Sequence, residues 1–490
     1  MTEEMARLRR EAVSGKLEKD RAALETLFHF PENQDIQLRE IRCQGSRVCA
    51  VFMDGMVRSS QVDDFIVRAV QRTGEPMPEE GRGEYLITQV LNVAQAQPEA
   101  EFGKICDGVL GGMTAVLAEG ADTAVLLDTR GFEKRGVEKA GNESVVLGAQ
   151  EGFTESIRTN LTLLRRYYQS ADLVTEVLSV GTEAPLKVAV VSVEGITNPR
   201  ALEILRKRLR KIRCGAVHGI GQLQQLIEDS PWALVPQMLM TERPDRAAAA
   251  LSDGQFVVVA DCSPYALIAP CSFFSLLQAS DDAFSRWQYG SYMRVVRFLG
   301  MLISLLLPGV YLALTEYHTF LIPVSLLTTI AETRANVPFP VYFEILLMEL
   351  SFFMINEANL RIPGQIGTSI GIIGALVLGQ TAAEASIISP ILIIIIAISG
   401  LGCYCMPSHS FTITLILYRL GIEALCLALG LYGLCLAVAL IVCQVCSLQS
   451  FGWDFMTPLA PHRPHNPDLI VRLPAFLQRK KVYARRGEKT

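Results

Sequence analysis

Short stretches of alternating apolar and polar residues in the front half of the chain predict strands separated by helices. Residues 36–41 and 48–53 alternate in this way, and the second stretch ends at Asp54-Gly55, a turn signal. Residues 152–169 carry apolar side chains three or four positions apart, which predicts an amphipathic helix. The other predicted strands cover 115–118, 123–128, 173–180, 186–193, 256–261 and 265–268, and the other predicted helices cover 60–72, 83–96, 101–110 and 199–211.

Strands that alternate with helices indicate α/β packing, in which the helices cover the faces of a sheet. We expect two small α/β subdomains, at 35–150 and 151–290, after a polar lead-in at 1–34. No sequence repeat of fixed period relates the two subdomains.

Long apolar runs make up most of the back half of the chain. The strongest lie at 298–315, 337–358 and 386–406, and shorter ones lie at 318–331 and 366–380. A bilayer core needs about 20 helical residues, so the strong runs are long enough to span it.

The length of the last apolar run, 411–446, fits neither one membrane span nor two. As one straight helix it would reach roughly 54 Å at about 1.5 Å per residue. That is too long for one span and short for two. Either the run contains a hairpin near Gly430–Gly433, or its start lies at the membrane interface, where Arg419 and Glu423 stand one helical turn apart.

Charged residues are distributed unevenly and separate the two halves. Residues 298–451 carry ten charged side chains, whereas residues 1–297 carry 74. The mean hydropathy of the whole chain is +0.30. A run so long and so poor in charge would expose too much apolar area to water. We therefore predict an α/β soluble N-terminal region followed by an α-helical polytopic membrane domain at 291–450.

Basic residues flank the apolar half on both sides. Arg286, Arg294 and Arg297 precede the first span, and the tail at 451–490 holds eight basic residues against three acidic ones. The positive-inside rule then predicts that both termini are cytosolic. The number of crossings is even under this topology, and four and six both fit.

Several functional classes lack their sequence signatures. The first 21 residues have no apolar core, so they predict no signal peptide, and no basic patch suggests nucleic-acid binding. The chain has no Walker A loop, and His462 and His465 have no cysteine or acidic partner at zinc spacing. The twelve cysteines form no disulfide or redox framework. We expect no enzyme, no cofactor and no metal site.

The apolar span 337–358 carries the most informative polar residues, because ionisable groups inside a membrane usually face a cavity, a partner or water. On a helix, Glu349 and Asn356 share a face, whereas Glu344 points elsewhere. One hypothesis is that Glu349 and Asn356 line a cation pathway, with Glu344 and Glu357 as further candidates. The alternative is that Glu349 pairs with a basic residue, such as Arg361 or Arg334, and fixes helix packing.

Other candidates concern packing, hinges and docking. Proline interrupts helices, so Pro338, Pro340 and Pro363 mark either span boundaries or a gating hinge, while three glycines form a close-contact face of GxxxG type. Arginines in the soluble half could dock a neighbouring subunit, but a solvated helix face or a local capping network explains them as well. These residues are Gly367, Gly371 and Gly374 for packing, and Arg158, Arg243 and Arg246 for docking.

Several longer segments, taken in their order along the chain, allow a comparison with a known protein family. Residues 151–166 read EGFTESIRTNLTLLRR, and 229–246 read DSPWALVPQMLMTERPDR. Residues 336–350 read NVPFPVYFEILLMEL, and 356–380 read NEANLRIPGQIGTSIGIIGALVLGQ. The tail, at 450–461, reads SFGWDFMTPLAP. In this order and spacing, from about residue 34 to 476, the chain resembles the A-subunit branch of the GerA spore germination family.

The resemblance implies an integral protein of the spore inner membrane. It implies two partners, a transporter-like B subunit that senses the nutrient and a lipoprotein C subunit. It also implies a ring of A subunits, five in the favoured arrangement, around a pore that releases monovalent cations. Three alternatives remain open: a SpoVAF-like germination paralogue in the same family, a transporter that works by alternating access, and a scaffold that conducts no ions. The absence of an inverted repeat counts against the transporter.

Overall fold

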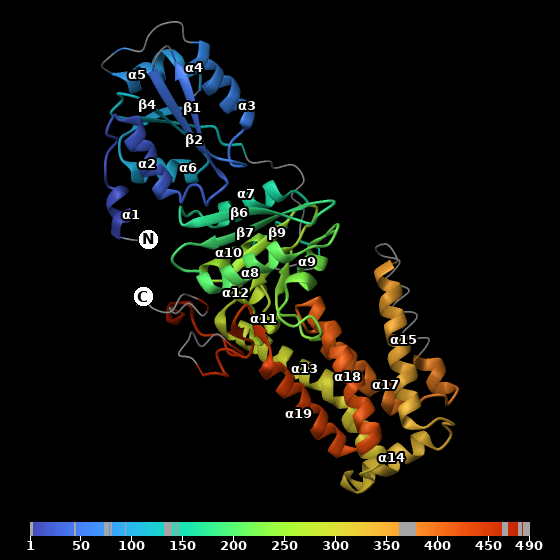
Figure 1. The fold of residues 1–490 in the computed structure, drawn as a ribbon. Helices are drawn as coiled ribbons and strands as arrows, with labels where there is room; N and C mark the ends of the chain where they lie inside the picture. The colour runs from blue at the N-terminus through green and yellow to red at the C-terminus, as the bar shows by residue number, and fades with distance from the viewer. Residues whose placement is uncertain are drawn as a thin grey trace.

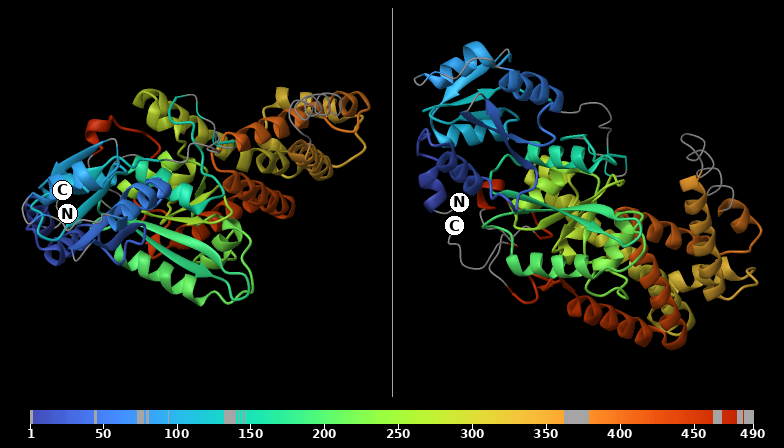
Figure 2. Two further views of the ribbon diagram at one scale, coloured as in Figure 1. Left: turned by 90° about the horizontal axis from the view of Figure 1, so that it is seen from above. Right: turned by 45° about the horizontal axis from the view of Figure 1, so that its top comes forward.

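Two α/β units and a helical bundle follow one another along the molecule, with the first unit and the bundle at opposite ends (Figure 1). Figure 2 shows the same arrangement from two further directions. The computed structural model describes residues 3–43, 46–72, 78, 81–93, 95–131, 140–141, 143, 145, 147–361, 379–462, 469–478 and 483. Helices, including short 3-10 and π-helical pieces marked η, and strands are numbered as in Figure 1.

The first unit contains one five-stranded antiparallel sheet in the order β1-β2-β4-β5-β3. Successive residues of the inner strand β2 point to opposite faces, with Cys49 and Val51 in one core and Val48 and Ala50 in the other. Helices therefore cover both faces. The elements are α1 (Glu3–Leu8), α2 (Leu17–Leu27), β1 (Ile36–Cys43), β2 (Ser46–Met53), α3 (Ser59–Gln61), η1 (Val62–Val67), α4 (Arg68–Arg72), α5 (Arg82–Tyr85), η2 (Leu86–Val90), β3 (Ala96–Glu99), α6 (Phe102–Leu110), β4 (Thr114–Ala118) and β5 (Ala124–Leu127).

The second unit also contains one five-stranded antiparallel sheet, in the order β6-β7-β9-β10-β8. One face packs on α8 and α9, and the other packs on α7 and α10. The elements are α7 (Ile157–Tyr167), β6 (Leu173–Val180), β7 (Leu186–Val193), α8 (Pro199–Lys211), α9 (Ile220–Ile227), β8 (Leu239–Thr241), α10 (Pro244–Ser252), β9 (Phe256–Ala260), β10 (Ala266–Ala269), α11 (Phe273–Leu277) and α12 (Asp281–Phe284).

The two sheets have the same topology. In each, the five strands in chain order take the spatial order first, second, fourth, fifth, third. In each, the strand at the far edge is the short third one, β3 or β8. The soluble half is thus a structural duplication, although its sequence contains no repeat of fixed period.

The back half forms a bundle of apolar helices. By length and composition, two described helices are able to cross a membrane, α13 and α18, and two shorter apolar helices, α17 and α19, accompany them. The elements are α13 (Trp287–Glu316), η3 (Thr319–Leu321), α14 (Val324–Arg334), α15 (Val341–Arg361), α17 (Pro390–Tyr404), α18 (His409–Leu429) and α19 (Leu431–Ser447), followed by β11 (Gln449–Ser450), β12 (Trp453–Asp454) and η4 (Ala475–Leu477).

The over-long apolar run forms a helical hairpin. α18 ends at Leu429, and Gly430 has a φ of 59° before α19 begins at Leu431. That positive φ is strained for most residues but open to glycine. The interfacial alternative for Arg419 and Glu423 is wrong, because both side chains are buried in the bundle.

The second unit and the bundle share one hydrophobic core. Val257 and Val259 of β9 belong to the same cluster as Met301 of α13 and Leu415 of α18. Thr414 of α18 also donates a 2.7 Å hydrogen bond to the Leu234 carbonyl oxygen of the second unit. Buried apolar contact of this kind favours rigid attachment of the second unit to α13 and α18.

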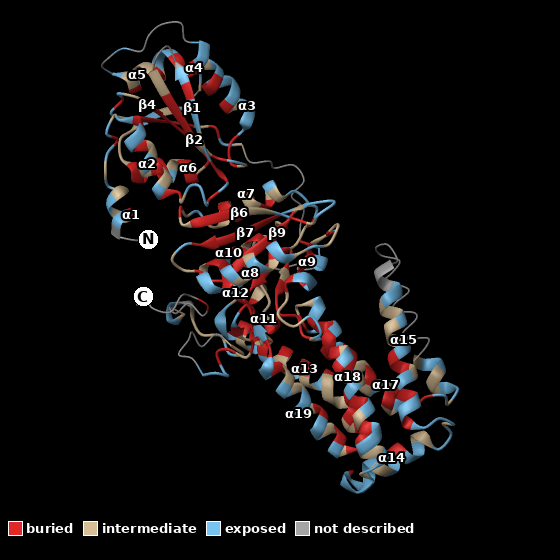
Figure 3. Cartoon of the chain, viewed as in Figure 1, coloured by how far each residue is buried: buried red, intermediate tan, exposed pale blue. Residues whose placement is uncertain are grey.

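α15 lies at the edge of the bundle and exposes an apolar surface (Figures 1 and 3). Leu346, Leu350 and Met354 of this helix are 57%, 55% and 65% exposed. Such a surface in a single chain is typical of a helix that faces lipid or another subunit.

Most predicted elements of the soluble half form near the predicted positions, but two edge strands, β3 and β8, were missed. The predicted helix at 83–96 ends at Val90, and Ala96–Glu99 forms β3 instead. The segment from Glu242 to Arg246, which carries two of the docking candidates, lies inside the second unit, where α10 begins at Pro244.

Candidate functional site

A buried ion cluster joins α15 to α18 inside the bundle. Arg419 Nε lies 2.6 Å from Glu349 Oε1 and 4.0 Å from Glu423 Oε1. The Glu349 side chain is 1% exposed and the Arg419 side chain 4%. Charges are expensive to bury and persist when they are paired, so this cluster ties the edge helix α15 to the centre of the bundle.

Polar groups of two further helices hold Arg419 in place. Arg419 NH1 donates a 2.8 Å hydrogen bond to Ser399 Oγ of α17, and that hydroxyl donates in turn to the Ser304 carbonyl oxygen of α13 at 2.9 Å. The chain of contacts therefore crosses four helices. Removing one member of such a network leaves the others buried without a partner.

Glu344, also on α15, makes polar contacts separate from the ion cluster. Its Oε2 accepts a 2.9 Å hydrogen bond from the Ser389 backbone N–H at the start of α17, and Arg334 Nε of α14 lies 3.5 Å from its Oε1. The predicted partner of Glu349 was Arg334 or Arg361. That expectation is corrected for Arg334, which pairs with Glu344, while Glu349 pairs with Arg419.

Asn356 lines a cavity of 590 Å³ between the bundle and the second unit. Tyr404 and His409 line it from the bundle, and Met240 and Tyr265 from the second unit. Glu349 does not line this cavity; it faces the ion cluster inside the bundle. Glu357, one residue after Asn356, is exposed.

Of the proline and glycine candidates, two prolines lie among the residues that the structure describes. Pro338 and Pro340 directly precede α15, and the Pro340 carbonyl oxygen accepts the first backbone bonds of that helix. This is the geometry of a helix start. Pro363, Gly367, Gly371 and Gly374 lie outside the described residues.

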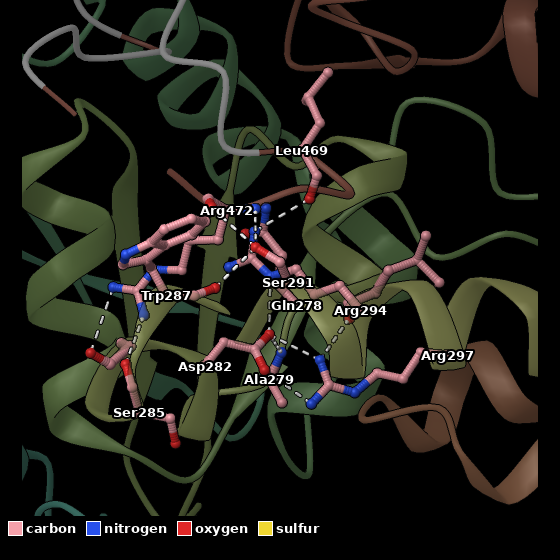
Figure 4. Close-up of polar contacts among 12 residues, drawn as sticks. Gln278, Ala279, Asp282, Ser285, Trp287, Ser291, Arg294, Arg297, Leu469 and Arg472 are labelled. Carbon is pink, nitrogen blue, oxygen red and sulfur yellow. Dashed lines mark hydrogen bonds and ion pairs between the residues drawn. The ribbon is translucent and has the colours of Figure 1, made fainter. Parts of the chain in front are cut away.

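A second cluster fixes the elbow where the second unit meets α13 (Figure 4). Asp282 of α12 binds Arg297 through both oxygens, at 2.7 and 2.9 Å, and accepts from Arg294 Nε at 3.0 Å. Arg294 also donates to the Leu469 carbonyl oxygen, and Ser291 donates to that of Arg472. The cluster thus ties α12, the first membrane helix and the C-terminal segment together.

The electrostatics of Asp282 favour its ionised form. Burial works against ionisation, but the guanidinium groups of Arg297 and Arg294 outweigh burial and hold the pKa of Asp282 below its usual value. A carboxylate at this position therefore remains charged at every physiological pH.

The arginines predicted to dock a neighbouring subunit all have partners within the chain. Arg158 of α7 lies 2.7 Å from Asp54 and 3.2 Å from Ser59, both in the first unit. Arg246 lies 3.1 Å from Glu143 Oε1 and donates to the Gln278 carbonyl oxygen. These contacts join segments of one chain.

Arg243 is the most deeply buried of the three. It is 0% exposed, and its guanidinium binds both oxygens of Asp245 and the carbonyl oxygens of Ala149 and Glu143. This is the local network expected as the alternative to docking.

Sequence reasoning missed Arg419, the cation at the centre of the site. Its i,i+4 partner Glu423 was visible in the sequence, but the two residues were considered only for a position at the membrane interface, as the alternative to a hairpin. The pair stands in the middle of the α18 apolar run, and this position was the available signal, because paired charges deep in a span usually face the bundle interior.

The fold and the ion cluster together define a class: an α/β N-terminal region followed by a bundle of apolar helices that encloses a buried ion cluster. Residues 23–483 match the family model described as Bacillus/Clostridium GerA spore germination protein. The chain belongs to this family.

Curated relatives agree with the family match. Spore germination protein GerLA of Bacillus cereus is 35% identical over 87% of this chain and 87% of its own length. Spore germination protein KA of Bacillus subtilis (strain 168) is 31% identical over 93% of this chain and 85% of its own length. The uncharacterized membrane protein YfkQ of the same organism is 31% identical over 88% and 84%.

One solved structure is similar to part of the chain. It is the crystal structure of the N-terminal domain of the A subunit of the Bacillus megaterium spore germinant receptor GerK3. It covers 54% of this chain and 98% of that one, with 20% identity and a TM-score of 0.41.

Proposed function

We propose that this chain is the A subunit of a nutrient germinant receptor in the spore inner membrane, with several membrane crossings and both termini in the cytosol. In this proposal it acts with a transporter-like B subunit and a lipoprotein C subunit. Copies of the chain assemble into a ring, five in the favoured arrangement, around a cation pathway that nutrient binding opens. Release of monovalent cations through this pathway starts germination.

The main support for the proposal is that α15 exposes apolar side chains and buries acidic ones. One side of this helix exposes Leu346, Leu350 and Met354, whereas the other holds Glu344 and Glu349 at 1% exposure each. An edge helix with an unpartnered apolar side favours contact with lipid or another copy of the chain. Val341, Ile345 and Met348 pack α15 on the bundle beside the two buried glutamates, so a change in charge at Glu344 or Glu349 would alter how α15 is held.

The cavity beside Asn356 supports a role for the C-terminal end of α15 in the same pathway. It lies where the second unit meets the bundle, so ions leaving the membrane on that side would pass the soluble domain. Asn356 supplies an amide oxygen there, a group that coordinates monovalent cations without binding them tightly.

The test is reconstitution of the chain with its B and C partners in liposomes, followed by potassium flux with and without nutrient. We expect nutrient-dependent flux from the complete receptor. Glu349→Gln keeps the shape of the side chain but removes its charge, and we expect it to change the flux while the protein stays in the membrane. Glu332→Gln, on the exposed face of α14, is the matched control.

Silent liposomes under every nutrient condition, with all partners present, would overturn the conduction part of the proposal. A size measurement that finds only single copies of the chain would overturn the ring. A second candidate is a SpoVAF-like germination paralogue of the same family. Genes for B- and C-type partners beside this gene would decide for the receptor subunit.

A further inference from the structure

The ion cluster between α15 and α18 contains more acid than base. Glu349 and Glu423 provide two carboxyl groups, and these lie within hydrogen-bonding reach of one another. Arg419 provides the one guanidinium, 2.6 Å from Glu349 and 4.0 Å from Glu423. One arginine balances one carboxylate, so a fully ionised cluster would carry an uncompensated negative charge inside an apolar bundle.

The surroundings do not supply the missing positive charge. Within the part of the chain that the structure describes, the polar groups near the cluster on the packed helices are hydroxyls and thiols. They are Ser304 of α13, Ser399 and Cys403 of α17, and Cys426 of α18.

The hydrogen-bonding pattern of the two carboxyl groups indicates that one of them carries a proton. Both Glu349 oxygens and Oε1 of Glu423 are buried and accept no hydrogen bond from any described donor. Two carboxylates cannot approach one another as acceptors only, because neither has a hydrogen to donate. A proton on either group turns the contact into an O–H···O hydrogen bond and balances the charge in the same step.

We infer that Glu349 and Glu423 share one bound proton, so that this pair is a proton-binding site inside the bundle, held in position by Arg419. The proton belongs to the pair and not to either residue alone. With the proton bound, the two carboxyl groups attract and α15 is latched to α18. When the proton leaves for solvent, the two carboxylates repel and the latch opens.

Infrared difference spectroscopy of the purified full-length chain in lipid tests this site directly. A neutral carboxylic acid has a carbonyl band that an ionised carboxylate lacks. We expect the wild type to show this band at neutral pH. Glu349→Gln and Glu423→Gln should each abolish it, because either change leaves one carboxylate facing one guanidinium.

Glu344→Gln is the matched control. Glu344 lies on the same helix as Glu349 and is equally buried, but Arg334 pairs with it one to one. We expect this variant to keep the band. A band that persists in both Glu349→Gln and Glu423→Gln, or is lost only in Glu344→Gln, would overturn the inference. A wild-type protein that lacks the band would also overturn the inference, even if potassium ions stabilise that protein.

The pH dependence of unfolding gives a second test that does not depend on ion conduction. The folded pair holds at neutral pH a proton that glutamates in an unfolded chain, with a pKa of about 4.3, have already released. Stability must therefore fall as the pH rises. Glu423→Gln keeps the latch hydrogen-bonded without a proton, so its melting temperature should fall less steeply as the pH rises above about 4.3. Parallel slopes for the wild type and this variant would contradict the site, whether or not the receptor conducts ions.

Discussion

Arg165 of α7 and Asp35, just before β1, form a buried two-fold contact between the two soluble units. Arg165 Nε and NH2 donate to the two carboxylate oxygens of Asp35 at 2.8 and 2.9 Å. NH2 also donates to Asn33 Oδ1 at 3.0 Å, and NH1 to the Ser170 carbonyl oxygen at 3.2 Å. The side chains are 2% and 8% exposed, so the contact is shielded from solvent and from salt.

Asp35→Ala should destabilise the full-length chain by about 3–5 kcal/mol, because it leaves the Arg165 guanidinium buried without its anionic partner. Thermal unfolding in detergent, with proteolysis between the two units as a second measure, checks this. Asp54→Ala is the control, since its pair with Arg158 at the same junction is about half exposed and should contribute about 0–1 kcal/mol. Equal losses for the two variants would contradict the assignment.

The fold of the soluble half could largely be predicted from its sequence, because its central strands and amphipathic helices follow simple periodicities. The strand β3 could not, since its sequence Ala-Gln-Pro-Glu has no alternation and Pro98 is disfavoured in strands except at edges. The duplication was also hidden, because strand order depends on pairing between distant segments.

The candidate site could be predicted only in part. Glu349 was found because an acidic residue in an apolar run is conspicuous whatever surrounds it. Its partner was not, since Arg419 is distant in the sequence and reaches Glu349 only when the helices of the bundle assemble. Local spacing reports on one helix face and carries no information about which helix lies opposite.

Asp282 should make the elbow between the soluble domain and α13 sensitive to acid. Because the pKa of Asp282 is lower in the folded chain than the unfolded value of about 3.9, its contribution is complete above that pH and is lost as the pH falls through the folded pKa. Asp282→Asn should cost about 3–5 kcal/mol at neutral pH and should abolish this part of the acid response.

Thermal unfolding between neutral and acidic pH, measured on the full chain, checks both effects of Asp282→Asn. The matched control is Asp63→Asn, whose pair with Arg39 is about half exposed and should matter little at any pH. If the melting temperature of Asp282→Asn still falls toward acidic pH as steeply as that of the wild type, other carboxylates dominate the acid response.

Phe451, directly after the bundle, is part of the core of the second unit. Its ring meets the Phe256 ring edge-on at a centroid distance of 5.1 Å, and the Arg208 guanidinium lies 4.9 Å from its centre. Phe451→Ala should therefore destabilise the soluble domain by about 3–5 kcal/mol, although the residue follows the last membrane helix.

Protease resistance of the soluble half within the full-length protein measures the Phe451→Ala effect. Leu459→Ala, at a site 58% exposed, should stay within about 0.5 kcal/mol of the wild type. If the two variants resist protease equally, the tail after residue 450 is a separate segment and not part of the core.

Gly402 of α17 allows the closest backbone approach to α13 and so sets the position of the ion cluster. A Cβ at Gly402 would lie 2.5 Å from the Gly300 carbonyl oxygen, and backbone atoms cannot move aside as a side chain can. Gly402→Ala should force α17 away from α13 and cost about 1–3 kcal/mol. Because Ser399 lies on the same helix, the shift should also weaken its hydrogen bond to Arg419.

Gly421→Ala separates this packing effect from the general effect of alanine in a helix. A Cβ at Gly421 meets nothing within 4 Å, so alanine there should stabilise α18 by about 1 kcal/mol through helix propensity alone. Melting temperatures of the two variants in detergent should therefore move in opposite directions. A shift of the same sign in both would mean that the α13–α17 contact tolerates a methyl group, and that Ser399 holds Arg419 without help from close helix packing.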